Sequence, residues 1–279
     1  MCCLGMIYHL RPRFAREGEA MLWDEFILTL DESLVGFLFP YGQLSLFLDQ
    51  SEAIGPSSFI GRLYGEILQV SYTSYYVWGN GLGVYLAIHY FSSALFNRPI
   101  NGENMPEAHQ WRRLQMFTAA WAGGFLFNFI LNMTFPAVSP RIFLKDMYVH
   151  DIEGIFFANG LRGALANAAA STFSAFPSGH CGMSWLTSAI AYRMGLTFYA
   201  KVSFIVGVMI TLATQVLRYH YFSDMLFAST LLAVGMKCGG MWEQAEYDCN
   251  VTGRKYVPGS SNEADIEVAV DKPTATSEV

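Results

Sequence analysis

Residues 176–185, FPSGHCGMSW, and residues 218–224, RYHYFSD, are the two stretches around which the chain is arranged. The first places a small-residue turn and His180 at the start of an apolar segment. The second places His220 and Asp224 at the start of another. The chain between the two histidines is long enough to cross a membrane and return. We therefore expect the histidines to be neighbours.

The composition is typical of a membrane protein. Only 14% of the 279 residues are charged and 53% are hydrophobic, whereas a soluble domain carries about 25% charged residues. The net charge of −6 is concentrated in residues 243–279, which contain eight acidic and three basic residues. No basic patch is visible, which excludes a nucleic-acid-binding surface. The five cysteines lack metal-ligand spacing, so we expect neither a metal nor a cofactor.

The apolar segments predict an all-α fold, a polytopic bundle of about six transmembrane helices. A span needs about 20 residues, and the segments that reach or approach this length are 26–48, 66–96, 114–135, 178–193, 200–217 and 221–238. We divide the chain into an N-terminal segment (1–25), a transmembrane domain (26–242) and a disordered acidic tail (243–279). Because segment 26–48 contains Asp31, Glu32 and Pro40, an interfacial helix is the alternative to a span there.

Two groups of residues in segment 66–96 have a structural interpretation. Tyr72, Tyr75, Tyr76 and Trp78 are typical of an aromatic belt at the membrane interface. Gly79 and Gly83 would let neighbouring helices approach closely.

Basic residues outside the spans predict the orientation. One side collects Arg11, Arg13, Arg16, Arg98, Arg112, Arg113, Arg193, Lys201 and Lys237, and the other collects Arg62, Arg141, Lys145, Arg162 and Arg218. The positive-inside bias puts the larger group and both termini in the cytoplasm. Both histidines then face the lumen of an endomembrane (Golgi or endoplasmic reticulum) or the exterior of the plasma membrane. With five spans, the N-terminus would instead lie on the non-cytoplasmic side, and the later helices would keep their orientation.

His220 and Asp224 are four residues apart and share one helix face. A carboxylate there fixes the imidazole tautomer and leaves the other ring nitrogen free as a base or nucleophile. In the alternative interpretation, both are hydrated interfacial side chains. His180 follows Ser178 and Gly179 at a predicted helix start, where free N–H groups attract an anion such as phosphate. A histidine there can act as a general acid, or simply be interfacial.

Together, the PSGH and HYFSD stretches resemble the type 2 phosphatidic acid phosphatase superfamily, over roughly residues 66–240. The resemblance implies a six-helix core with an extracytoplasmic site. It also implies that His220 is the nucleophile that forms a phosphohistidine, that Asp224 orients it and that His180 protonates the leaving oxygen.

The sequence departs from the usual phosphatase pattern in the arginines. Thr214 stands where these phosphatases carry an arginine six residues before the second histidine. Residues 135–141, FPAVSPR, are similar to the inositol phosphorylceramide synthase branch, which implies Arg141 as a phosphate ligand. Ser178, Gly179 and Arg218 are further candidate phosphate-binding residues, and Lys145 is another. Arg141 alternatively marks the membrane edge.

The expected function is a membrane lipid phosphotransferase that needs no metal. Its substrates would be membrane lipids: a phospholipid donor of a group such as phosphoinositol, and a ceramide-like acceptor or water. A lipid phosphate phosphatase with the same site is the alternative, and so is a non-catalytic lipid-binding protein.

Overall fold

The computed structural model describes residues 23–96, 106–169 and 175–253. Five long helices form a bundle: α4 (Phe59–Phe96), α5 (Glu107–Thr134), α8 (Gly179–Arg193), α9 (Thr197–Val216) and α10 (Phe222–Cys238). The described residues include no strand, so the predicted all-α fold is confirmed.

Helix α8 is the central element of the bundle, because it contacts α4, α5, α9 and α10. The core consists of apolar side chains that are fully buried, among them Leu82, Met183, Leu186, Ile190 and Ile210. Helices α4 and α5 meet closely at Gly79 and Gly83. A Cβ on Gly79 would overlap the Trp121 ring, and one on Gly83 would lie 2.8 Å from Phe117. The expected close approach at these glycines is therefore present.

Two described helices, α5 and α9, are long and apolar enough to cross a membrane by length and composition. Helices α8 and α10 have 15 and 17 residues, about 22 to 26 Å at 1.5 Å per residue. That length is slightly below the thickness of a bilayer core, about 30 Å. The two apolar helices support a membrane protein, and the number of spans remains a prediction.

The predicted first span, 26–48, is wrong. This region forms α2 (Asp24–Val35), the short 3-10 helix η1 (Pro40–Gly42) and α3 (Leu44–Asp49). A 12-residue helix is about 18 Å long and cannot cross the bilayer core. Tyr41 and Gly42 have positive φ angles of 52° and 69°, so the chain turns sharply between the two α-helices.

The predicted disorder of residues 243–279 is wrong for their first part, since α11 (Gln244–Thr252) is a helix. Glu243 and Glu246 form its capping box. Tyr247 and Val251, one helical turn apart, are buried, and the helix packs against α5. Residues 254–279 lie outside the described residues.

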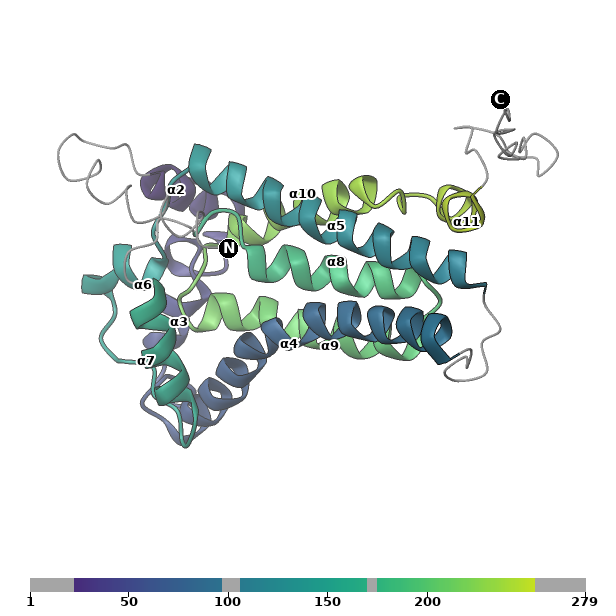
Figure 1. Ribbon diagram of the computed structural model, residues 1–279. Coiled ribbons are helices and arrows are strands. Elements are labelled where there is room, and N and C mark those ends of the chain that lie inside the picture. The colour runs from purple at the N-terminus through teal and green to yellow at the C-terminus, as the bar shows by residue number, and fades with distance from the viewer. Residues whose placement is uncertain (1–22, 97–105, 170–174, 254–279) are drawn as a thin grey trace, which may run out of the picture.

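The long connection 136–177 contains α6 (Pro140–Phe143), the 3-10 helix η3 (Lys145–Met147) and α7 (Ala158–Ala169). Figure 1 shows α2, α3, α6 and α7 gathered at one end of the bundle, whereas α11 lies at the other. The end with the four short helices also holds the starts of α8 and α10, and therefore both sequence motifs.

Candidate active site

His220 lies in the short turn between α9 and α10. Its backbone N–H donates to the carbonyl of Thr214 at 3.1 Å. The side-chain amide of Gln215 donates to the carbonyl of His220 at 3.2 Å. The end of α9 therefore fixes the backbone from which the imidazole projects.

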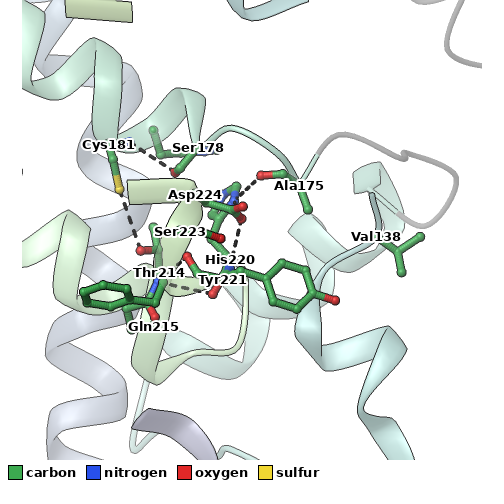
Figure 2. Close-up of polar contacts among 12 residues, drawn as sticks. Val138, Ala175, Ser178, Cys181, Thr214, Gln215, His220, Tyr221, Ser223 and Asp224 are labelled. Atoms are coloured by element: carbon green, nitrogen blue, oxygen red, sulfur yellow. Dashed lines mark hydrogen bonds and ion pairs between the residues drawn. The ribbon is translucent and has the colours of Figure 1, made fainter. Parts of the chain in front are cut away.

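The imidazole of His220 is oriented by two acceptors (Figure 2). Its Nδ1 lies 2.7 Å from the carbonyl oxygen of Ala175 and 3.2 Å from Oδ2 of Asp224. Because a carbonyl oxygen can only accept, Nδ1 donates and carries the proton. The neutral ring then has its lone pair on Nε2. Asp224 lies where an orienting carboxylate is predicted, whereas no sequence pattern indicates the contact with Ala175.

Asp224 joins the two sequence motifs. The residue is fully buried in the first turn of α10, and its Oδ2 also accepts from the backbone N–H of Tyr221 at 2.9 Å. The backbone N–H of Ser178 donates to the carbonyl of Asp224 at 3.3 Å. The starts of α8 and α10 are therefore adjacent, as the spacing of the motifs predicts.

His180 lies in the first turn of α8, with its ring centroid 6.1 Å from that of His220. The ring stacks on Tyr72 at 4.2 Å, and the Tyr72 hydroxyl lies 3.1 Å from Nδ1. Tyr75 packs beside it at 4.5 Å. Tyr72 and Tyr75 are buried, so their interpretation as an aromatic belt is wrong, while Tyr76 is half exposed. Nε2 of His180 is buried and has no hydrogen-bond partner among the residues that the structure describes.

Ser178 and Gly179 have structural functions at the start of α8. The Ser178 hydroxyl accepts from the backbone N–H of Cys181 at 3.3 Å and is the N-cap. A Cβ on Gly179 would lie 2.9 Å from the Asn128 amide nitrogen, so glycine permits the contact with α5. The Ser178 side chain is thus engaged within the protein. The first backbone N–H groups of α8 are the part of this helix that can bind an anion.

Arg141 and Arg162 converge on the ring of Tyr219, at 5.3 and 5.8 Å from its centroid. Tyr219 stacks on Tyr72 at 4.5 Å, which connects the arginines to His180. Nη1 of Arg162 is buried, and no described residue forms a hydrogen bond with it. Burial lowers the pKa of Arg162, and the charges of Arg218 and Arg141 lower it further. An anion beside these guanidinium groups would therefore be stabilised.

Arg162 is a site residue that sequence reasoning did not select. The predicted orientation puts it on the same side as the two histidines, but no motif marks it. Helix α7 carries it to the site, and Glu66 of α4 holds the start of α7. The Glu66 carboxylate accepts from the four consecutive backbone N–H groups of residues 155–158, at 2.7 to 3.2 Å.

Arg218 is already paired within the protein. Its Nη2 lies 2.8 Å from Oδ1 of Asp49, and both side chains are buried. Its guanidinium group also stacks on Tyr148, 3.7 Å from the ring centroid. The geometry therefore favours a structural role for Arg218 over the predicted contact with phosphate. Lys145 is exposed on η3.

Three buried aspartates of residues 24–49 hold the loops of the site: Asp24, Asp31 and Asp49. Asp31 accepts from the backbone N–H groups of Phe222 and Ser223, at 2.7 and 2.8 Å. Sequence reasoning did not assign these contacts because the partners are up to about 200 residues away. Acidic residues within an apolar segment were the signal that could have indicated them.

Comparisons with known proteins match much of the chain, including the residues of this site, to one superfamily. A sequence model described as the PAP2 superfamily matches residues 105–238. The chain is 38% identical, over 228 residues, to a PA-phosphatase related-family protein of Dictyostelium discoideum. That alignment covers 81% of this chain and 41% of the relative, so the chain spans about two fifths of the relative's length. No solved structure matches the chain. These findings support the PAP2 superfamily for the part of the chain that carries His180, His220 and Asp224.

Proposed function

We propose that the chain is an integral membrane enzyme that cleaves a phosphate ester of a lipid, with His220 as the nucleophile. The observation that carries the proposal is the orientation of His220. Ala175 and Asp224 occupy Nδ1, which leaves the Nε2 lone pair available. The second histidine is 6.1 Å away, centroid to centroid, so both imidazoles belong to the same site.

In the first step, Nε2 of His220 attacks phosphorus while the bond between phosphorus and the leaving oxygen breaks. A protonated His180 donates its Nε2 proton to that oxygen, and Asp224 stabilises the positive charge on the His220 ring. In the second step, a hydroxyl group attacks the phosphohistidine. His180 takes the proton of this hydroxyl, and His220 is released.

The phosphate charge would be met by Arg141, Arg162 and the first amides of α8. Arginine suits this role because its planar fork can pair two phosphate oxygens. Membership of the PAP2 superfamily supports a phosphatase-type enzyme with lipid phosphate substrates.

Phosphotransfer to a lipid hydroxyl is the second candidate, and Thr214 is the observation that favours it. Thr214 is fully buried and donates from its hydroxyl to the carbonyl of Thr211 at 2.7 Å. It therefore cannot replace the arginine that phosphatases carry at this position. The resemblance of residues 135–141 to the inositol phosphorylceramide synthase branch adds to this candidate.

The test uses the full chain reconstituted in lipid vesicles with labelled phosphatidic acid, a panel of head-group donors and ceramide. Release of free phosphate identifies a phosphatase, and a labelled new lipid identifies a transferase. We expect His220→Ala to lower turnover by at least about 1,000-fold, because the nucleophile is removed. Wild-type turnover in this variant would refute the mechanism. Absence of turnover by the wild type on every donor would favour the non-catalytic alternative.

A further inference from the structure

Helix α2 presents three different surfaces along its length. At 100° per residue, Asp24, Ile27, Asp31 and Val35 fall on one narrow stripe. All four are buried against the protein. We call this the protein stripe.

The exposed side of α2 divides into two further stripes. The polar stripe consists of Glu25, Thr29, Glu32 and Ser33, and all four are exposed. The apolar stripe consists of Phe26, Leu30 and Leu34. Phe26 is 59% exposed and Leu34 is 40% exposed. An apolar stripe beside a polar one, on a helix already bound to protein, is the pattern of a helix that lies at a bilayer surface.

The apolar stripe continues into the rest of the molecule. Directly after α2, Phe37 is 81% exposed and Leu38 is 55% exposed. At the start of α2, Trp23 packs against Phe135 at the end of α5, 5.0 Å between centroids. The α10 residue Phe227 belongs to the same series of ring contacts and is itself 42% exposed. A series of ring contacts therefore connects the start of α2 to the end of α5 and to α10.

The protein stripe holds the turn that carries His220. Asp31 caps the first N–H groups of α10 and also accepts from the side-chain amide of Gln43 at 2.8 Å. Asp24 accepts from the Tyr221 hydroxyl at 2.7 Å and from the backbone N–H of Val138 at 3.1 Å. Since Tyr221 directly follows His220, the two carboxylates of α2 fix the position of the turn.

We infer that α2 is an interfacial helix that binds the bilayer surface through Phe26, Leu30 and Leu34, and that Asp24 and Asp31 are positioning residues for His220. The helix connects the lipid surface to the turn between α9 and α10. The positioning part rests on the proposed function, whereas the bilayer contact does not.

The bilayer contact is tested with nitroxide labels on single cysteines placed in α2 of the full chain, in phosphatidylcholine vesicles. The chain keeps the buried Cys181 and Cys249, and serine replaces the other cysteines. Labels at positions 26, 30 and 34 are expected to be accessible to oxygen and protected from a water-soluble nickel chelate. Labels at 25, 29 and 33 are expected to show the reverse. Equal accessibility to the chelate at all six positions would overturn the inference, and so would protection from both reagents, which would indicate a protein partner.

The positioning role is tested by comparing Asp31→Ala with Glu32→Ala, its exposed neighbour. We expect Asp31→Ala to lower kcat about 10- to 100-fold while KM stays within about twofold, because the turn and not the lipid contact is displaced. Glu32→Ala should keep both constants. Equal constants in the two variants would overturn the positioning role. If the wild type shows no turnover while the labels on the apolar and polar stripes differ as expected, the proposed function fails and the bilayer contact stands.

Discussion

At the scale of single residues, the two histidines differ in the hydrogen-bond partners of their rings. His220 is fixed by a carboxylate and a carbonyl, both of which favour a proton on Nδ1. His180 is surrounded by tyrosines, and its Nδ1 meets a hydroxyl. A hydroxyl can donate or accept. The His180 ring can therefore keep this hydrogen bond in both the protonated and the neutral state, as a general acid must.

Tyr72→Phe tests the hydroxyl that contacts His180. The substitution keeps the ring that stacks on His180 and removes one hydrogen bond, so we expect kcat to fall about tenfold. The measurement is steady-state turnover in vesicles. Tyr85→Phe is the control, because Tyr85 is on the same helix but packs against His89. An unchanged kcat in Tyr72→Phe would show that the stacked ring alone positions His180.

Arg162→Gln tests whether the guanidinium group found at Tyr219 binds phosphate. Loss of a charge-assisted contact with the substrate should lower kcat/KM about 10- to 100-fold. Arg62→Gln is the matched control, since Arg62 forms an exposed ion pair with Glu153 at 3.6 Å, and such pairs contribute little. Similar kcat/KM values in the two variants would contradict a role for Arg162.

At the scale of elements, short helices outside the five-helix bundle complete the site. Helix α7 brings Arg162, and its start is held by the Glu66 carboxylate. Helix α2 brings two buried carboxylates to the turn of His220. A buried, ionised carboxylate is stable only when several hydrogen-bond donors contact it. The loops of the site supply these donors, so the short helices and the loops depend on each other.

The buried carboxylate of Asp31 predicts a pH dependence of stability. Burial raises the pKa of Asp31, although hydrogen bonds from Ser223, Phe222 and Gln43 act against the shift. Between the unfolded and the raised folded pKa, the folded chain binds a proton that the unfolded chain has released. Stability contributed by this group is therefore complete below the unfolded pKa and is lost as the pH rises through the folded pKa.

Thermal unfolding in detergent, from about pH 4 to pH 7, measures this effect. The decrease in Tm with rising pH should be shallower in Asp31→Asn than in the wild type, because one titrating group is absent. Glu32→Gln, on the exposed side of α2, should follow the wild-type curve. Identical slopes in Asp31→Asn and the wild type would refute the assignment.

At the scale of the whole molecule, the two ends of the bundle differ. One end holds the site and helices α2, α3, α6 and α7, and the other holds α11 (Figure 1). Arg112 and Arg193 of the second end donate to α11 and the turn before it. Crossing of the membrane by all five long helices would place the described N-terminal and C-terminal parts on opposite sides. The positive-inside bias still assigns the α11 end to the cytoplasm.

An epitope inserted at the exposed Glu52 and another at the end of the chain test this topology. In sealed right-side-out vesicles, or the equivalent endomembrane preparation, we expect antibody or protease to reach the two epitopes from opposite sides. The six-span prediction also places Glu52 and the C-terminal epitope on opposite sides, so the two epitopes test the five long helices that both arrangements share. Detection of both epitopes on the same side would contradict the five-helix arrangement.

The sequence determined the parts of this protein that depend on neighbours along the chain. Runs of apolar residues set the five long helices. A spacing of four residues put His220 and Asp224 on one helix turn, and the start of α8 fixed His180. Each follows from helical periodicity, and the proximity of the two motifs follows from the length of chain between them.

Only the tertiary structure decided which partners the charged side chains contact. Asp49 neutralises Arg218, Glu66 holds the helix of Arg162, and Asp31 caps α10. The same physical reason explains the errors for residues 26–48 and 244–252. The conformation of a short segment depends on the surface that it packs against, because a helix of fewer than about 12 to 15 residues is only marginally stable alone. That surface is assembled from segments far away in the sequence, so local pattern cannot specify it.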